Sequence, residues 1–235
     1  MNCIFLRRGY GEIENGNTMS DTFSENDWAT IILACQGNAV PNTWAVGNSK
    51  TMTIGGADYQ IDIIGKNHDT YSSGGTAPLT FQLHDCYGTK YQMYNSSSAT
   101  AAVGWSNSSM RQTHLPSILT KMPSEVQTAI KEVNKKTLAA NLSSTISTTS
   151  DKLFLLSEIE VLGSIANSKS GEGTQYAYYK NGGSKIKNFS GSASYWTNRS
   201  PNASVNNQFC AIGTGGSGAT VMSTGSWGVS FAFCF

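Results

Sequence analysis

Two His-Asp dipeptides, His68-Asp69 and His84-Asp85, are the residues of this sequence best suited to metal or acid–base chemistry. Their imidazole nitrogens and carboxylate oxygens would together suit one divalent metal if the two loops met. Adjacent residues on a strand point to opposite faces, so each dipeptide supplies only one ligand from regular structure. We therefore expect hydrogen-bonding side chains at strand ends, and we predict no metal and no other cofactor.

Other catalytic patterns are incomplete. Gly216-Ser217-Gly218 is only part of a nucleophile elbow, and the surrounding run 213–218 lacks the Lys-Ser/Thr of a phosphate loop. His114 falls on a predicted helix. Glu158 and Glu160 are two residues apart and would diverge on a helix, unlike the paired carboxylates of a glycosidase. The protein is predicted not to be an enzyme.

The five cysteines are widely spaced and form no Cys-x-x-Cys pair, which disfavours a zinc ribbon or a thioredoxin-type site. Cys210 and Cys234 each follow a phenylalanine, and these matching dipeptides are candidates for neighbouring strands. Three interpretations stay open for the pair: buried thiols that pack as small hydrophobic groups, a disulfide, or reactive or metal-binding chemistry. The five are Cys3, Cys35, Cys86, Cys210 and Cys234.

The elements that must position these residues belong to a neutral, loop-rich chain. Gly, Ser, Thr and Asn make up 97 of the 235 residues, while charged residues are 13% and the formal net charge is +1. Soluble proteins average about 25% charged residues. A net charge near zero argues against nucleic acid and anionic membranes as binding partners, because both bind clusters of Lys and Arg. Five Trp, ten Tyr and nine Phe argue against disorder.

Targeting signals are not evident in the sequence. No apolar run approaches the roughly 18–20 residues that a membrane span needs. The N-terminus lacks the h-region of a signal peptide, because the apolar run 4–6 precedes Arg7-Arg8 instead of following it. We expect the protein to accumulate in a cytoplasm and to leave the cell by lysis or as part of a particle.

Hydrophobic periodicity predicts helices and hairpins in the first two thirds of the chain. Residues 24–27 offer N-cap chemistry for a helix with apolar positions from Trp28 to Cys35. Residues 50–54 and 59–63 alternate around Gly55-Gly56, which predicts a hairpin, and residues 79–83 predict a strand. Further helices are expected near Met110 and from 124 to 133.

The remaining pattern predicts a loop over 141–150, a short buried strand over 152–156, and a helical turn or bend ending at Gly163. Beyond Gly163, short strands and irregular loops are expected. The fold class is therefore α+β, with hairpins first, two central helices and a loop-rich C-terminal third.

Residues 190–230 have a composition that suits binding. Asn, Ser, Thr and Gln interleave there with Tyr195, Trp196 and Trp227. Aromatic rings supply contact area at low entropic cost, and small polar residues adapt their hydrogen bonds, as in antibody paratopes. Saccharides suit the same composition. The alternative is that the aromatic residues belong to the core, which we expect for Phe209, Phe231 and Phe233.

An ordered set of dipeptides and tripeptides in this region resembles an uncharacterised domain family that is common in Firmicutes and their phages and prophages. Shorter matches extend upstream, so the resemblance covers about residues 24–235. That family is similar to C-type-lectin-like domains, to formylglycine-generating-enzyme-like folds and to the variable proteins of diversity-generating retroelements. The C-terminal matches are Tyr195-Trp196, Arg199-Ser200-Pro201, Phe209-Cys210, Gly216-Ser217, Gly228-Val229 and Phe233-Cys234.

Three positions depart from the family pattern. Thr197-Asn198 replace its usual Trp-Leu, Gly215 stands where Asp is common, and Phe231-Ala232 replace Pro-Gly. No calcium-binding Glu-Pro-Asn motif is visible, so calcium-dependent sugar binding is not carried over.

The resemblance implies a C-type-lectin-like domain over residues 24–235, preceded by a leader or attachment segment, 1–23. It implies a phage tail or baseplate protein that binds a protein or glycan on a host cell surface, alone or beside other tail proteins, and as a possible homo-oligomer. The alternatives are a formylglycine-generating-like enzyme, a metal-dependent enzyme around the His-Asp dipeptides, or a structural virion subunit. The location implied is the virion, or the bacterial cytoplasm before release.

Two residue sets follow from these expectations. Arg199 is expected to hold loop carbonyls or a carboxylate with its fork of donors. The expected framework is Trp196, Arg199, Pro201, Phe209, Gly228 and Phe233. The expected contact surface is Asn198, Asn202, Ser204, Asn206, Gln208, Thr220, Met222, Thr224, Ser226 and Trp227.

Overall fold

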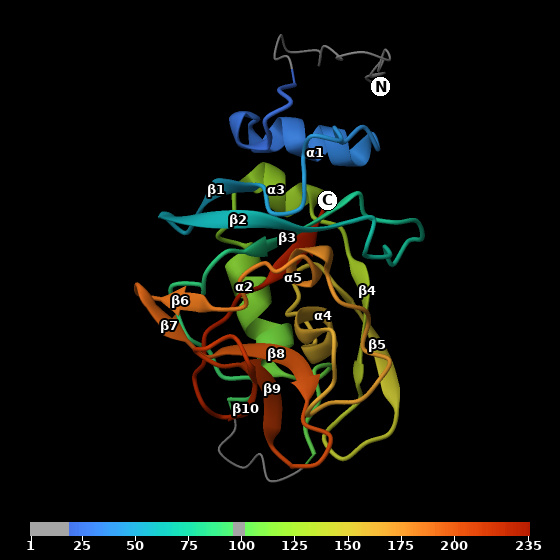
Figure 1. The fold of residues 1–235 in the computed structure, drawn as a ribbon, viewed down its shortest axis with the longest axis vertical. Helices are drawn as coiled ribbons and strands as arrows, with labels where there is room; N and C mark the ends of the chain where they lie inside the picture. The colour runs from blue at the N-terminus through green and yellow to red at the C-terminus, as the bar shows by residue number, and fades with distance from the viewer. Residues whose placement is uncertain (1–18, 96–101) are drawn as a thin grey trace.

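A four-stranded antiparallel sheet crosses the upper half of the protein in the order β1-β2-β3-β11 (Figure 1). The computed structural model describes residues 19–95 and 102–235. The strands are β1 (Ser49–Ile54), β2 (Ala57–Lys66), β3 (Leu79–Leu83) and β11 (Ala232–Cys234). The last strand of the chain therefore lies beside the first three, and it pairs Cys234 with Thr80.

The predicted hairpin is confirmed. Ile54 pairs with Ala57, so Gly55 and Gly56 form a two-residue turn, with φ angles of 61° and 84°. Positive φ at both central residues is the requirement of a type I′ turn, which glycine meets without a steric cost. The predicted strand at 79–83 is also confirmed, but both its faces are buried, since all five of its residues are buried.

Helices cover both sides of this sheet, with α1 and α3 above it and α2, α4 and α5 below it in Figure 1. The predicted first helix is confirmed as α1 (Trp28–Gln36), and its N-cap Asp27 accepts a hydrogen bond of 2.7 Å from the Thr30 amide. Trp28 packs edge-on against Phe81 of β3, with ring centroids 5.9 Å apart. Burying such aromatic rings supplies much of the stabilisation of a core.

The central helices are shorter than their hydrophobic pattern predicts. A π-helical turn (Met110–His114) leads into α2 (Leu115–Leu119), and α3 (Ser124–Ala129) follows. The expected helix from 124 to 133 is wrong in its second half, because β4 (Val133–Leu138) begins at Val133. Val133, whose spacing continued the helical stripe, is buried on that strand instead.

Two other expectations need correction. Residues 141–150, expected as a loop, include part of β5 (Ile146–Asp151), which pairs with β4 along its length. The strand expected at 152–156 is reduced to a single bridge between Phe154 and Ala232. The turn after it is confirmed: α4 (Glu158–Leu162) ends at Gly163, whose φ is 73°.

The C-terminal third consists of short strands and loops, as predicted, with one additional short helix, α5 (Ala177–Lys180). A second antiparallel sheet, in the order β10-β9-β8, occupies the lower end of the protein (Figure 1). The strands here are β6 (Lys187–Phe189), β7 (Ser192–Ser194), β8 (Trp196–Pro201), β9 (Gln208–Ile212) and β10 (Gly218–Met222).

The predicted boundary after residue 23 falls inside the folded unit. Residues 1–18 of the predicted leader lie outside the described residues, but Phe23 opens a short 3-10 helix (Phe23–Glu25) and is 2% exposed. Its ring lies 5.5 Å from that of Trp44, whose indole nitrogen donates to the Ser20 carbonyl. Residues 20–23 therefore pack with the domain.

The four cysteines within the described residues, Cys35, Cys86, Cys210 and Cys234, are buried and form no disulfide. Cys210 lies on β9 and Cys234 on β11, which belong to different sheets, so the two Phe-Cys dipeptides are not on neighbouring strands. Burial raises the pKa of the thiol to about 12 for Cys35 and about 11 for Cys86. Cys210 and Cys234 are likewise buried free thiols whose pKa burial raises, which agrees with the first of the three interpretations, packing as small hydrophobic groups.

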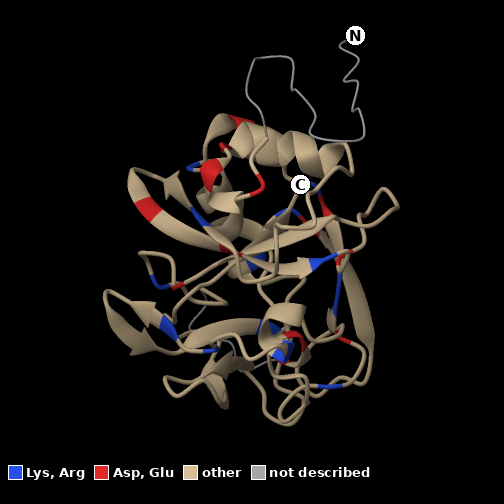
Figure 2. Ribbon diagram, turned by 45° about the horizontal axis from the view of Figure 1, so that its top comes forward, with Lys and Arg blue, Asp and Glu red and all other residues tan. Residues whose placement is uncertain are grey.

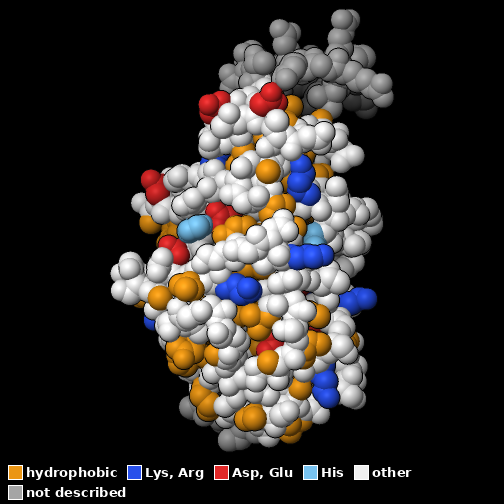
Figure 3. Space-filling model, viewed as in Figure 1, with side chains coloured by type: hydrophobic (Ala, Val, Ile, Leu, Met, Phe, Trp, Pro, Cys, Tyr) orange, Lys and Arg blue, Asp and Glu red, His pale blue; other side chains and the backbone are white. Residues whose placement is uncertain are grey.

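Charged residues are sparse and distributed over several elements, as Figure 2 shows. The face in Figure 3 likewise carries few charged side chains, with hydrophobic ones interspersed over its lower half. Over residues 19–95 and 102–235, no helix combines the length and the apolar character that spanning a bilayer requires.

Candidate functional site

Eight of the ten expected contact residues lie at the surface of the lower end. They come from the β8–β9 loop, from β9 and β10, and from the loop after β10, and each is exposed or half-exposed. We call this set the C-terminal surface: Ser204, Asn206, Gln208, Thr220, Met222, Thr224, Ser226 and Trp227.

The pairing of β9 with β10 brings these segments together. Gln208 and Met222 are direct cross-strand partners, and the Gln208 amide nitrogen lies 3.9 Å from the Met222 sulfur. Just beyond them, the Ser223 amide donates to the Asn207 carbonyl at 2.7 Å. The loops on either side of the hairpin are therefore held next to each other, because the antiparallel register fixes which residues face each other.

Trp227 is the best-fixed side chain of the C-terminal surface. Its backbone N–H and C=O both pair with Tyr91, at 3.0 and 3.1 Å, and its indole nitrogen donates to the Met222 carbonyl at 2.9 Å. A Cβ atom on Gly225 would lie 2.6 Å from the same indole nitrogen, so glycine is needed there for the ring to lie flat. The half-exposed ring is thus held in one position before any partner arrives.

Tyr195 extends this aromatic position, although the sequence assigned it no contact role. Its ring centroid is 6.0 Å from that of Trp227, and the residue is 40% exposed. The contact depends on a bridge between Trp196 and Gly228, two residues 32 positions apart that join β8 to the last loop. In the sequence, the one signal for the contact between Tyr195 and Trp227 was the ordered family motif, which contains both Tyr195-Trp196 and Gly228-Val229.

Asn198 and Asn202 do not belong to the contact surface, so that part of the prediction is wrong. Asn202 is 5% exposed, and its side-chain oxygen accepts from the amides of Ser204 and Val205. It therefore shapes the β8–β9 loop by a local side-chain-to-backbone turn. Asn198 is fully buried on β8, and both its side-chain polar atoms lack a hydrogen-bond partner within the described residues.

All six expected framework residues are buried: Trp196, Arg199, Pro201, Phe209, Gly228 and Phe233. Gly228 is required by close packing, because a Cβ atom there would lie 2.7 Å from the Tyr195 carbonyl oxygen and 2.6 Å from the Cys86 sulfur. Phe233 supports the other sheet, on β11, where its ring stacks on Phe81 at 5.4 Å.

The predicted role of Arg199 is confirmed. Its Nη2 lies 2.8 Å from Glu160 Oε1, and its Nη1 donates to Glu160 Oε2. The same guanidinium donates to the carbonyls of Leu155, Lys136 and Glu172. Arg199 is fully buried, so its planar fork joins β8 to α4 and β4 from inside the protein.

Glu160 is positioned for this pair by the N-terminus of α4. Its side chain accepts from the Ser157 amide while the Ser157 hydroxyl accepts from the Glu160 amide, which is a capping box. Burial alone would raise the pKa of the Glu160 carboxyl, but Arg199 and Lys135 outweigh burial and lower it. Glu160 therefore stays ionised inside the protein.

Lys135 extends the pair into a buried ionic cluster of Arg199, Glu160, Lys135 and Asp69. Its Nζ lies 2.8 Å from Glu160 Oε1 and 2.7 Å from Asp69 Oδ1, and both Lys135 and Asp69 are 3% exposed. Burial raises the pKa of Asp69, but Lys135 and nearby hydrogen bonds outweigh that effect and hold it at about 2. The four formal charges cancel, as a buried cluster requires.

The two His-Asp dipeptides lie at separate places. His68 stacks on Tyr176, with ring centroids 3.9 Å apart, and it lines a pocket of about 310 Å³ above Lys135 and Glu160. Burial lowers the pKa of His68, an effect that Asp69 partly offsets. The Tyr176 hydroxyl donates to Asp69, which leaves that carboxylate saturated with partners from its own chain.

His84 instead pairs with Asp62, with Nδ1 2.7 Å from Oδ2, and this hydrogen bond raises the pKa of His84. Asp85 accepts from the backbone amide of Asn188 at 2.7 Å. Within residues 19–95 and 102–235, no group of three or more His, Cys, Asp or Glu residues is arranged to hold a metal ion. Hydrogen-bonded groups next to strands, the first expectation, describe Asp69, His84 and Asp85, whereas His68 is placed by its stacking on Tyr176.

A buried lysine next to His84 escaped the sequence analysis. The Lys187 ammonium is 2.6 Å from the Leu83 carbonyl oxygen and 2.7 Å from that of His84, and it lies over the Trp196 ring. Burial lowers its pKa to about 8. Lysine in a polar C-terminal segment gives no sign of burial, because its partners are main-chain carbonyls about 100 residues earlier.

These features define an α+β protein with a neutral, aromatic-centred surface at one end and a buried ionic cluster that joins β8 to α4 and β4. The chain belongs to the family described as Domain of unknown function (DUF6273), whose sequence model matches residues 81–235. The matched segment begins in β3 and includes the whole C-terminal surface. Comparison with curated proteins and with solved structures found no match.

Proposed function

We propose that this protein is a non-enzymatic binding protein that contacts a protein or glycan on a bacterial host cell through its C-terminal surface. The observation that carries the proposal is the half-exposed Trp227, which lies beside Tyr195 and makes two hydrogen bonds with its backbone and one with its indole nitrogen. Neutral amides and hydroxyls surround the two rings. A rigid aromatic centre with an adaptable polar rim is the arrangement that binding surfaces favour.

The proposed setting is a phage tail or baseplate, and the proposed fold is C-type-lectin-like. Support for both comes from the ordered C-terminal motif, whose buried members hold the loops that display the C-terminal surface. Arg199 contributes most, because it ties β8 to α4 and to β4 at once. The variable proteins that the motif resembles present their binding residues from such a scaffold.

The test is binding of fluorescently labelled full-length protein to a panel of Firmicute cells, measured by flow cytometry. Trp227→Ala removes the central ring, and central tryptophans in interfaces commonly contribute 2 kcal/mol or more, about 30-fold in affinity. We expect wild-type protein to bind at least one strain and Trp227→Ala to lose at least tenfold in apparent affinity.

Leu33→Ala provides the matched control, since it truncates a half-buried apolar side chain on α1 at the other end of the protein. Both variants are first compared with wild type by thermal unfolding. Equal binding by Trp227→Ala would remove the C-terminal surface from the proposal.

A structural virion subunit is the second candidate, favoured by exposed apolar side chains on this end, among them Val205 and Met222 at 43% each. Mass photometry separates the two functions. Stable trimers or larger species whose assembly Met222→Ser disrupts would identify the surface as a subunit interface.

A further inference from the structure

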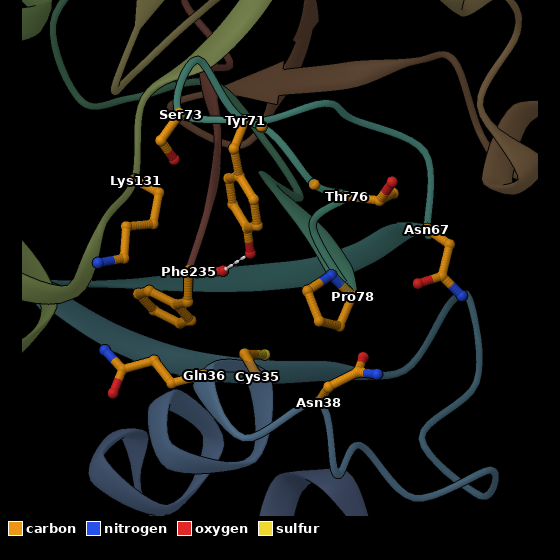
Figure 4. Close-up of a pocket in the computed structure, with 12 residues that line it drawn as sticks. Cys35, Gln36, Asn38, Asn67, Tyr71, Ser73, Thr76, Pro78, Lys131 and Phe235 are labelled. Atoms are coloured by element: carbon orange, nitrogen blue, oxygen red, sulfur yellow. Dashed lines mark hydrogen bonds between the residues drawn. The ribbon is translucent and has the colours of Figure 1, made fainter.

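A second hollow, of about 730 Å³, lies far from the C-terminal surface (Figure 4). It is formed by the end of α1, the 67–78 loop between β2 and β3, Lys131 and Phe235. Figure 1 places α1 at the upper end of the long axis and β9 and β10 at the lower end. We call this hollow the Tyr71 groove, and neither the sequence motifs nor the proposed function uses it.

The floor of the Tyr71 groove is apolar and fixed. The Tyr71 hydroxyl donates to the Phe235 carbonyl oxygen, which orients the half-buried phenol ring along the groove (Figure 4). Phe235, Pro78 and Cys35 complete the floor, and all three are buried. Because the Tyr71 hydroxyl is already hydrogen-bonded to Phe235, the part of Tyr71 that lines the groove is its apolar ring.

The rim is polar, and its side chains have no hydrogen-bond partner among the described residues. Elsewhere in the protein, amide side chains such as those of Asn26, Asn141 and Asn202 bind backbone groups. The rim side chains make no such bonds and extend into the groove or beside it in Figure 4. These residues are Gln36, Asn38, Asn67, Ser73, Thr76 and Lys131, and each is exposed.

Ordered turns display this rim. Tyr71 and Gly75 are joined by a backbone hydrogen bond of 3.0 Å, and the backbone N–H of Asn67 donates to the Pro78 carbonyl at 3.1 Å. Asn38 and Asn67 have φ angles of 50° and 52°, a left-handed conformation that asparagine tolerates better than most residues. The two side-chain amides therefore project from fixed backbone positions near Pro78, with Asn67 to its right and Asn38 below it in Figure 4.

The chemistry of the lining selects the ligand class. Among the residues that the structure describes, no Asp or Glu lines the groove and Lys131 is the single lining cation, so the lining matches neither a cationic nor a multiply charged anionic ligand. Amides and hydroxyls both donate and accept hydrogen bonds, as the hydroxyls of a sugar do. A pyranose ring presents an apolar C–H face and a polar edge, which matches the Tyr71 floor and the amide rim. The volume is in the range of small-molecule sites.

From this complementarity, we propose that the Tyr71 groove is a saccharide-binding site, separate from the C-terminal surface. The sugar ring lies against the Tyr71 face, and the amides of Asn38 and Asn67 bind its hydroxyls. Lys131 donates a further hydrogen bond from the groove's other side.

The test uses a printed array of neutral oligosaccharides, N-acetylhexosamine oligomers and uronic-acid saccharides, probed with labelled full-length protein. The variants are Asn38→Gly and Asn67→Gly, because glycine accepts the same left-handed φ while it removes the amide. Each lost amide is expected to reduce affinity by about 2- to 12-fold, and the double variant by the product of the two losses, about 4- to 140-fold. Tyr71→Leu should abolish binding.

Asn207→Gly is the matched control, since Asn207 has a φ of 54° and does not line the groove. Trp227→Ala separates this proposal from the proposed function: it should leave array binding through the groove unchanged even if cell binding is lost. Saccharide binding that falls in the groove variants and persists in both controls supports the proposal. No binding to any array saccharide, or binding that Asn38→Gly and Asn67→Gly leave intact, would overturn it.

Discussion

Replacing Arg199 by methionine removes one charge from a cluster that the rest of the protein cannot neutralise. Glu160, Asp69 and Lys135 would remain, with a net charge of −1 in a region where each of these side chains is at most 3% exposed. Breaking a buried ion pair by deleting one partner costs about 3–5 kcal/mol. For a chain of this length, that loss lowers Tm by about 6–20 °C.

Urea unfolding followed by tryptophan fluorescence measures the loss in free energy of unfolding directly. Arg199→Lys keeps the charge but lacks the bidentate fork to both Glu160 oxygens, so an intermediate loss is expected. Glu160→Gln alone should cost as much as Arg199→Met, because it leaves Arg199 and Lys135 facing only Asp69.

The double variant Arg199→Met/Glu160→Gln decides whether charge balance is the reason. It restores neutrality, so its loss should be smaller than the sum of the two single losses by at least about 1 kcal/mol. A loss below 1 kcal/mol for Arg199→Met, or strictly additive losses, would refute the argument that the cluster is held by mutual neutralisation.

Three further outcomes are expected. Because the pKa of Lys187 is about 8 in the folded protein and 10.5 in an ordinary setting, wild type should gain up to about 3 kcal/mol of stability as pH rises between these values. Lys187→Met should lack that gain in a pH series of urea unfolding curves, and parallel curves would contradict it. Gly228→Ala should destabilise the protein by roughly 1–3 kcal/mol, since its Cβ would lie 2.7 Å from the Tyr195 carbonyl oxygen. An unchanged Tm would contradict this and show that the backbone around residue 228 shifts to make room for the methyl group. Iodoacetamide at pH 8 should leave the four buried thiols unmodified in native protein and label them in 6 M guanidinium, as peptide mass spectrometry would show; native labelling of any of them would mean that its site opens.

Local sequence patterns were sufficient wherever an element is decided by neighbours in the chain. The Asp27 cap, the Gly55-Gly56 turn and the Gly163 end of α4 each depend on residues within a few positions. Arg199 was anticipated because a guanidinium in a framework motif needs acceptors. The identity of its carboxylate was beyond reach, since Glu160 is 39 residues away.

Elements decided by distant partners escaped prediction. Val133 continues a helical stripe, but the pairing with Asp151 across the β4–β5 ribbon is more favourable, so the helix ends early. Asn198 was assigned to the surface from its polarity, whereas β8 places it inside. The Tyr71 groove combines segments around residues 36, 71, 131 and 235, and no spacing rule connects them.

The position of β11 also determines when this protein can fold. Cys234 pairs with Thr80, 154 residues earlier, so β3 keeps an open edge until residues 232–234 are available to pair with it. Phe81 and its neighbours then lack the Phe233 and Phe235 rings that cover them in the finished protein. Completion of the first sheet is therefore non-local, and topologies rich in such contacts fold slowly. Until that pairing forms, β3 presents an unpaired apolar edge, the kind of edge through which partly folded chains aggregate.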